Sequence, residues 1–252
     1  MGQERLSELM NQTRFSKVDY LNEIVDPRIY EEELERRNME SRLNNCGLNK
    51  RHQCCTFDKY VVTEENKVAF EKVKEYAETF KRGTTGAWLY IAGEYGTGKT
   101  HLAASICNHI LASRPISRNG IYRTTLYPNC KFDTMIGIAD KLRSAMISNS
   151  DLMERYGGAD LLVIDDLGKE KATNWSMEKL YQIIDKRYTE YKPTVITSNY
   201  GLQALAERLT IDGNDDVVQS IVSRLTEMCK GVLIKGEDWR KTHKVESIPN
   251  WY

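Results

Sequence analysis

The feature that most constrains this chain is a glycine-rich loop at residues 93–100, Gly-Glu-Tyr-Gly-Thr-Gly-Lys-Thr. An apolar run at 87–92, typical of a buried strand, precedes the loop, and a helical pattern at 99–111 follows it. Glycines let backbone N–H groups turn toward a phosphate, and the positive end of the following helix faces the same anion. The spacing G-x₄-G-K-T in this context predicts a phosphate-binding loop. We expect a nucleoside triphosphate to contact these residues: Gly93, Glu94, Tyr95, Gly96, Thr97, Gly98, Lys99, Thr100 and His101.

A second signal is an apolar run that ends in two acids, Leu-Leu-Val-Ile-Asp-Asp at residues 161–166. In α/β sheets, ligands bind beyond the carboxyl ends of the strands, where Asp165 and Asp166 would emerge. We expect Lys99 to contact the β- and γ-phosphates, and Thr100 and Asp165 to hold Mg²⁺. Asp166 would orient or deprotonate the attacking water. The predicted chemistry is therefore nucleotide hydrolysis that depends on magnesium.

The remaining apolar patterns predict an α/β fold with a parallel sheet covered by helices on both faces. Short apolar runs that are typical of buried strands alternate along the chain with helical patterns that repeat near 3.6 residues. The pattern predicts strands at 120–125, 161–164, 194–197 and 231–235, and helices at 64–81, 134–147 and 176–191.

The N-terminal part has a different texture. Residues 28–43 show a helical pattern that is rich in Glu and Arg and has few apolar positions, and residues 44–52 are typical of a linker. A helix this polar cannot support its own core. It is either a solvated surface helix or an arm that docks onto a partner. We therefore expect a small helical N-terminal arm at 1–55 and an ATPase domain at 56–252.

Composition excludes some classes of function. Lys and Arg total 36 and Asp and Glu also total 36, so no global basic field indicates nucleic acid. No apolar run is long enough to span a bilayer, and the N-terminus lacks a signal-peptide segment. These features favour a cytoplasmic protein in which the cysteines stay free thiols. Zinc held by Cys46, His52, Cys54 and Cys55 is an alternative that their irregular spacing disfavours.

The order of these signals resembles the AAA+ ATPases, and within them the bacterial helicase loaders of the DnaC and DnaI type and their IstB-like relatives. The resemblance covers about residues 57–240. Besides the two nucleotide motifs, its carriers are Thr-Phe-Asp-Lys-Tyr at 56–60, Asp-Asp-Leu-Gly at 165–168, Thr-Val-Ile-Thr-Ser-Asn at 194–199, Ser-Arg-Leu at 223–225 and Asp-Trp-Arg at 238–240.

Three residue roles follow from this resemblance. Asn199 would be the sensor that positions the hydrolytic water, and Arg224 would be the finger that reaches a neighbouring subunit's ATP. Arg240 would be a second sensor that contacts phosphate in the same subunit. The sequence departs from larger AAA+ machines because little chain follows Arg224, so a compact helical lid is not expected.

The resemblance implies a replication helicase loader: the arm at 1–55 would hold a hexameric helicase, subunits would associate through Arg224, and single-stranded DNA would lie along the ATPase domain. An IstB-like transposition helper is the alternative, and a small-molecule kinase is a third possibility that leaves Asn199 and Arg224 without a role. The segment 125–132 carries Tyr127, Lys131 and Phe132, which suit base stacking, but it is more typical of an ordinary loop.

Overall fold

The structure is a computed structural model that describes residues 27–80, 88–112, 127–144, 148–211 and 216–242. The chain divides into two compact units, Met1–Arg42 and Leu43–Tyr252. The strand predicted at 120–125 lies outside the described residues. The division of function between an arm at 1–55 and a domain at 56–252 stays a prediction.

The described part of the first unit is helical. Helix α2 spans Pro27–Cys46 and so crosses the boundary between the units. Its charges pair along one face: Glu33 accepts hydrogen bonds from Arg36 and Arg37 at 2.8 and 2.9 Å, and these bonds lower the pKa of Glu33 to about 2. Such exposed pairs stabilise a helix only weakly. Among the described residues, no helix is both long and apolar enough to cross a membrane.

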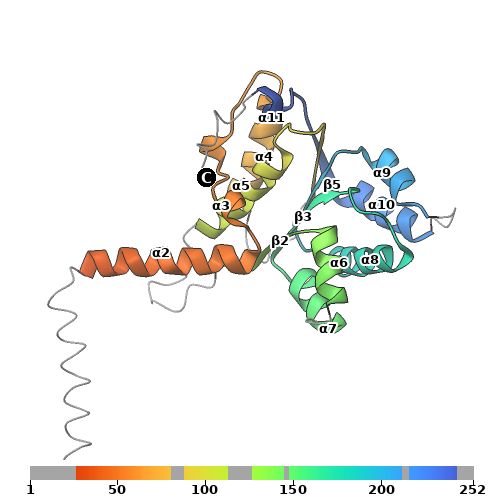
Figure 1. The fold of residues 1–252 in the computed structure, drawn as a ribbon, viewed down its shortest axis with the longest axis horizontal. Coiled ribbons are helices and arrows are strands. Elements are labelled where there is room, and N and C mark those ends of the chain that lie inside the picture. The colour runs from red at the N-terminus through yellow and green to blue at the C-terminus, as the bar shows by residue number, and fades with distance from the viewer. Residues whose placement is uncertain (1–26, 81–87, 113–126, 145–147, 212–215, 243–252) are drawn as a thin grey trace, which may run out of the picture. The chain divides into compact units, whose positions relative to one another are not determined.

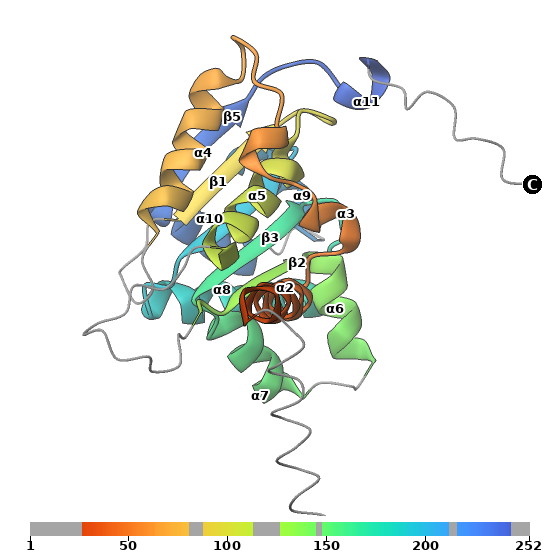
Figure 2. The same cartoon turned by 90° about the vertical axis from the view of Figure 1, so that its left-hand side faces the viewer.

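The second unit is built on a five-stranded sheet with the strand order β2-β3-β4-β1-β5, in which every neighbouring pair is parallel. The strands are β1 (Trp88–Gly93), β2 (Cys130–Thr134), β3 (Leu161–Leu167), β4 (Thr194–Ser198) and β5 (Cys229–Ile234). Figures 1 and 2 show the sheet from two directions. This arrangement confirms the predicted parallel α/β fold.

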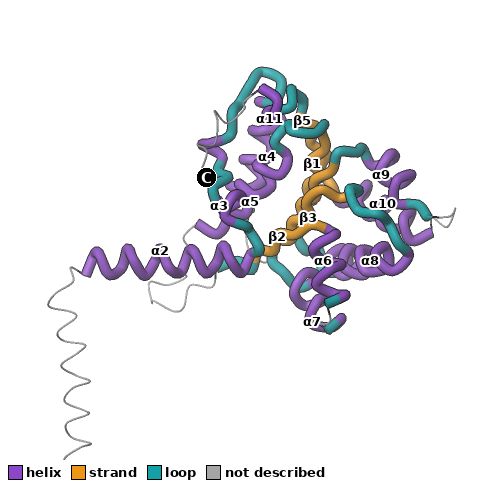
Figure 3. The backbone as a smooth tube through the Cα atoms, viewed as in Figure 1, coloured by secondary structure: helices purple, strands orange, loops and turns teal. Residues whose placement is uncertain are grey.

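Helices cover both faces of the sheet (Figure 3). On one face lie α4 (Lys67–Thr79) and α5 (Lys99–Ala112), and on the other lie α8 (Asn174–Thr189), α9 (Leu202–Leu209) and α10 (Asp216–Met228). Helix α6 (Met135–Arg143) packs beside β2 and β3. Shorter elements are α3 (Lys50–Gln53), a 3₁₀ turn (Phe57–Lys59), α7 (Asn149–Leu152), a π-helical turn (Met153–Gly157) and α11 (Trp239–Thr242).

The core lies between the sheet and these helices. Because both faces of β3 and β4 are covered, their residues are buried in succession instead of alternating, which explains the continuous apolar runs in the sequence. A charged side chain is also buried there: Arg187 of α8 is fully buried and donates to the carbonyls of Tyr156, Ala159 and Pro193. Burial lowers the pKa of Arg187 to about 9.

Two segments differ from the sequence-based expectation. Residues 44–52, expected as a linker, contain the end of α2 and most of α3, and Cys46 and Leu48 are buried. The segment 125–132, expected as a loop, contributes Cys130 and Phe132 to β2. Both short elements leave little pattern in the sequence, because α3 has four residues and buries none of them, and β2 has five residues and buries two.

Candidate nucleotide-binding site

The glycine-rich loop connects β1 to α5 and contains two residues with left-handed backbone. Gly96 has φ 76° and Gly98 has φ 91°, a region that residues with a β-carbon rarely adopt. Space is limiting as well. A β-carbon at Gly96 would lie 1.7 Å from the Asp238 carboxylate, and one at Gly98 would lie 2.6 Å from the Tyr60 ring. The loop therefore needs glycine at both positions, as the predicted phosphate-binding loop requires.

Lys99 lies inside this loop, with 5% of the residue exposed. Its Nζ donates to the carbonyl oxygens of Gly93 at 2.9 Å and Glu94 at 2.7 Å. Burial lowers the pKa of Lys99, and the nearby Asp166 carboxylate opposes that shift. The Lys99 ammonium contacts two neutral carbonyls in a site largely shielded from solvent. An anionic partner would stabilise it further, because hydrogen bonds between charged groups are stronger than those to neutral ones. The side chain is thus suited to bind a phosphate.

Asp165 lies in the C-terminal half of β3, where its carboxylate meets two threonine hydroxyls. The Thr100 hydroxyl donates to Asp165 Oδ1 at 3.0 Å, and the Thr197 hydroxyl donates to the same oxygen at 2.6 Å. Only 3% of Asp165 is exposed, and this burial raises its pKa, while the bond from Thr197 opposes the shift. Hydroxyl and carboxylate oxygens are the donors that Mg²⁺ prefers. Thr100 and Asp165 therefore fit the magnesium ion expected beside a triphosphate.

Asp166 adopts an unusual backbone conformation, with φ 57°. Its N–H donates to the Thr197 hydroxyl at 2.8 Å, and the pairing of β3 with β4 is irregular between Ile164 and Leu167. Lys169 donates to its carboxylate at 2.6 Å. A non-glycine residue in the left-handed region is uncommon and marks places where the surroundings over-determine the backbone. Asp165 is buried and Asp166 is partly exposed, and both carboxylates act on the charge of Lys99.

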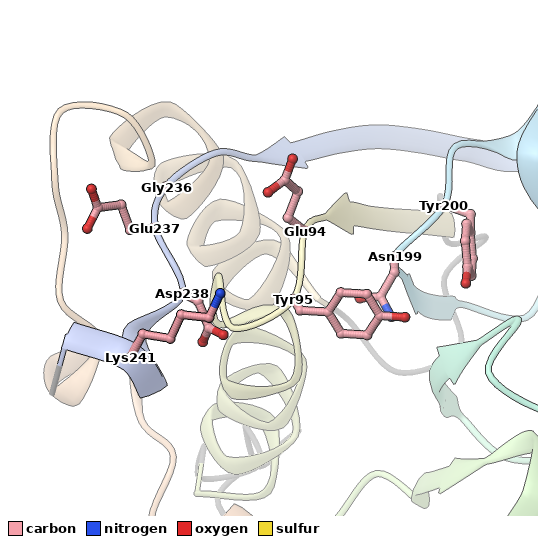
Figure 4. Close-up of a pocket in the computed structure, with 8 residues that line it drawn as sticks. All are labelled: Glu94, Tyr95, Asn199, Tyr200, Gly236, Glu237, Asp238 and Lys241. Atoms are coloured by element: carbon pink, nitrogen blue, oxygen red, sulfur yellow. The ribbon is translucent and has the colours of Figure 1, made fainter. Parts of the chain in front are cut away.

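A pocket of about 580 Å³ opens beside the loop and includes two of the predicted nucleotide contacts. Its lining, drawn in Figure 4, consists of Glu94, Tyr95, Asn199, Tyr200, Gly236, Glu237, Asp238 and Lys241. Asn199 and Tyr95 both line this pocket. The Asn199 Nδ2 is buried and has no hydrogen-bond partner among the described residues. A buried hydrogen-bond donor without a partner destabilises the folded state, so this amide would gain from a hydrogen bond to a ligand or to water.

The C-terminal segment also meets the loop. The Trp239 N–H donates to the Gly96 carbonyl at 3.2 Å, which fixes the start of α11 against the loop. The Arg240 side chain is exposed. Its positive charge nevertheless acts on Lys99. Burial is the main cause of the lowered pKa of Lys99, and the charge of Arg240 lowers that pKa further. The structure thus brings Arg240 to the same region as Lys99.

Arg224 lies elsewhere, on α10 where that helix packs against α8. Its guanidinium donates to Asp185 at 2.6 Å and to the Tyr181 hydroxyl at 3.2 Å. It also lies over the rings of Tyr181 and Tyr188, at 4.9 and 5.3 Å from their centroids. These contacts hold Arg224 within its own subunit, where it is 22% exposed. Any finger role toward a neighbouring ATP remains a prediction.

The sequence interpretation missed some residues of the site. Thr197 binds both acids, but it lies within an apolar strand pattern and its role depends on how β4 pairs with β3. Tyr60 donates to the Thr97 carbonyl at 3.0 Å from a segment noted only for its family resemblance. The His101 ring, predicted near nucleotide, is occupied by the Thr56 carbonyl at 2.9 Å. One of the two ring nitrogens of His101, Nε2, is therefore used in a contact away from the nucleotide.

Two alternatives that the sequence disfavours find no support among the described residues. Phe132 is buried, so it cannot stack on a base, and Lys131 donates to the Asn45 carbonyl at 2.7 Å. The cysteines near the N-terminus do not form a zinc site either. Cys46 is buried beside Cys107 while Cys54 is exposed, and no group of three or more metal-ligating side chains occurs among the described residues.

Comparisons with known proteins agree with this geometry. The family model described as IstB-like ATP binding protein matches residues 2–247. The chain is 30% identical over 181 residues to the replicative helicase loader DnaC of Escherichia coli (strain K12), which covers 70% of this chain and 69% of that protein. It is also 30% identical to the phage-like element PBSX protein XkdC of Bacillus subtilis (strain 168), over 72% of this chain and 64% of that protein.

Solved structures show the same fold. A crystal structure of DnaI superposes with a TM-score of 0.60 at 20% identity, covering 76% of this chain and 93% of that one. A crystal structure of the DnaC helicase loader gives 0.57 at 24% identity, covering 74% and 100%. The phosphate-binding loop, the acidic strand end and these matches lead to one conclusion: the chain belongs to the IstB-like ATP-binding family of AAA+ proteins, which is related to the replicative helicase loader DnaC.

Proposed function

We propose that this protein is an ATPase that loads a hexameric replicative helicase onto single-stranded DNA. The observation that carries the ATPase assignment is the convergence of Lys99, Thr100 and Asp165 at the carboxyl ends of β1 and β3, with the partly exposed Asp166 next in the chain. The loader assignment is supported by the similarity to DnaC.

Hydrolysis needs a group that orients water in line with the γ-phosphate. Asp166 suits this task because its carboxylate is partly exposed and is held by one removable partner, Lys169. The unpaired Asn199 amide can donate to the water or to the γ-phosphate without changing its own charge. Lys99 binds the phosphates, and Thr100 with Asp165 hold the magnesium ion, which neutralises charge that develops during transfer.

Arg224 is proposed to act on the ATP of an adjacent subunit. Its guanidinium is supported by Asp185 and by two tyrosine rings, so a charged group of fixed orientation stands at the surface of α10. A guanidinium held in this way loses little freedom on meeting a γ-phosphate. Arg240, at the loop of its own subunit, would instead contact the phosphates of the ATP bound to that subunit.

The remaining partners are also proposals. The N-terminal arm at 1–55 would hold the helicase, in keeping with the charged, weakly apolar character of α2. Single-stranded DNA would contact the ATPase domain through a local surface, since the net charge of the chain is zero. This loader would work in the cytoplasm.

ATP turnover by the full chain, measured alone, with single-stranded DNA, and with the replicative helicase, tests the proposal. We expect DNA and helicase to change the rate, and we expect the helicase to appear on covalently closed single-stranded circles only when the protein and ATP are present. The Lys99→Ala variant is the control for contaminating ATPases. The loader assignment is contradicted if neither DNA nor helicase changes the rate of ATP turnover and the helicase loads equally well without the protein.

The match to the IstB-like family model keeps a transposition helper as the second candidate. The two functions share the ATP site and differ in the partner. Affinity capture with the tagged full chain in the presence of ATP distinguishes them: recovery of a transposase and no helicase would favour the helper. Membership in this family removes the reason to consider a small-molecule kinase.

A further inference from the structure

A short segment, residues 52–60, runs along α5 and ends at the phosphate-binding loop. Hydrogen bonds fix it at three places. Near the end of α5, the Asn108 amide donates to the carbonyls of His52 and Cys55. Toward the start of the helix, His101 Nε2 donates to the Thr56 carbonyl at 2.9 Å. We refer to residues 52–60 as the α5 strap.

The last residue of the α5 strap, Tyr60, contacts the loop itself. Its hydroxyl donates to the Thr97 carbonyl at 3.0 Å. Its ring lies against Gly98, because a β-carbon there would be 2.6 Å from the ring edge. The ring is held in turn by Phe70, stacked at 5.6 Å and 15°, and by an edge contact with His101 at 5.4 Å. The hydroxyl is therefore presented by a rigid ring.

This hydrogen bond determines the direction of a neighbouring N–H group. In a planar trans peptide, the C=O of one residue and the N–H of the next point in opposite directions. With the Thr97 carbonyl turned toward Tyr60, the Gly98 N–H points away from Tyr60. Gly98 has φ 91° and no β-carbon, so its own conformational preference does little to stop this peptide from rotating.

We propose that Tyr60 is a positioning residue for ATP: its hydroxyl locks the Thr97–Gly98 peptide so that the Gly98 N–H is aimed at the bound phosphates. This inference rests on the nucleotide site proposed above and adds a contact from outside the loop. Burial raises the pKa of Tyr60 to about 12, so the hydroxyl remains a donor throughout the physiological range.

The test compares Tyr60→Phe with wild type in the full chain. Phenylalanine keeps the stacking on Phe70 and the contact with Gly98 and removes only the hydroxyl. We expect the Kd for ATP to rise by roughly three- to tenfold, as for loss of one well-directed hydrogen bond between neutral groups. The KM for ATP should rise by the same factor while kcat at saturating ATP stays unchanged. The reason is that the phosphate-binding loop contacts the phosphates equally in the ground state and in the transition state.

Tyr76→Phe is the matched control. Tyr76 lies on α4, and its buried hydroxyl has no hydrogen-bond partner among the described residues, so its removal should leave ATP affinity unchanged. Inorganic tripolyphosphate, measured by competition with a fluorescent ATP analogue, shows which part of the nucleotide is affected. We expect Tyr60→Phe to weaken the binding of tripolyphosphate by the same factor as the binding of ATP.

Three results would overturn the inference. Equal ATP affinity of Tyr60→Phe and wild type would show that the hydroxyl does not direct the loop. Weaker binding of ATP with unchanged binding of tripolyphosphate would show that Tyr60 acts on the nucleoside and not on the phosphates. An equal loss in Tyr76→Phe would indicate a general effect on folding. A wild-type protein that binds no ATP would contradict the proposed function itself, which is a separate outcome.

Discussion

Thr197→Val probes the hydroxyl that joins the two acids. Thr197 is fully buried, donates to Asp165 at 2.6 Å and accepts from the Asp166 N–H at 2.8 Å. Valine has the same shape but removes both bonds. A bond to a charged group contributes about 1.5–3 kcal/mol, and an unpaired buried N–H costs about 1–3 kcal/mol. Because the extra methyl recovers part of this, we expect the free energy of unfolding to fall by about 3 kcal/mol at pH 7.

Thr197→Ser is the matched variant, since it keeps the hydroxyl and loses one methyl. It should cost only about 1 kcal/mol. Urea denaturation of both variants, followed by circular dichroism at fixed ionic strength, measures the difference. If Thr197→Val is as stable as Thr197→Ser, the hydroxyl does not hold the acids and the reasoning is refuted.

The same variant has a predictable pH dependence. Burial raises the folded-state pKa of Asp165, so protonation of this carboxyl favours the folded state and stability is lost as pH rises through the folded pKa. The hydrogen bond from Thr197 opposes this upward shift. In Thr197→Val the pKa of Asp165 therefore rises further, and the variant has lost more stability than wild type by pH 7. The stability gap to wild type should therefore narrow as pH is lowered from 7 toward 4. A gap that stays constant would show that the bond does not act on the ionised carboxylate.

Three further predictions concern the site and its support. Asp166→Asn should bind ATP with nearly normal affinity but hydrolyse it at least about a hundredfold more slowly; unchanged turnover would reject Asp166 as the group that activates water. Arg224→Ala should hydrolyse ATP poorly but regain activity when mixed with Lys99→Ala, because each subunit supplies what the other lacks; a mixture no more active than the sum of its parts would exclude a finger acting between subunits. Arg187→Met should lower the free energy of unfolding by about 3 kcal/mol or more, since it leaves several buried carbonyls without donors; a loss below about 1 kcal/mol in urea denaturation would show that those carbonyls find other partners.

The phosphate-binding loop and the acidic strand end could be predicted because their chemistry is local. A G-x₄-G-K-T sequence between a strand and a helix, and two acids after a buried strand, each occupy fewer than about ten consecutive residues. The parallel sheet followed from the alternation of strands and helices. Lys99, Thr100 and Asp165 accordingly come together as expected.

The residues that could not be predicted act across the sheet or along a helix. Thr197 reaches Asp165 only because β4 pairs with β3, and Tyr60 reaches Thr97 only because residues 52–60 follow α5. Neither pairing leaves a mark in the local sequence. The partner of Arg224, Asp185, is likewise set by how α10 packs on α8. Contacts between distant segments were thus the part that required the structure.

A crystal structure of the full chain with Mg²⁺ and a non-hydrolysable ATP analogue tests the central claim most directly. The account predicts that Lys99 Nζ leaves the carbonyls of Gly93 and Glu94 to contact the phosphates, and that Thr100 and Asp165 lie around the magnesium ion. An analogue bound elsewhere, with Lys99 still donating to those two carbonyls, would contradict it.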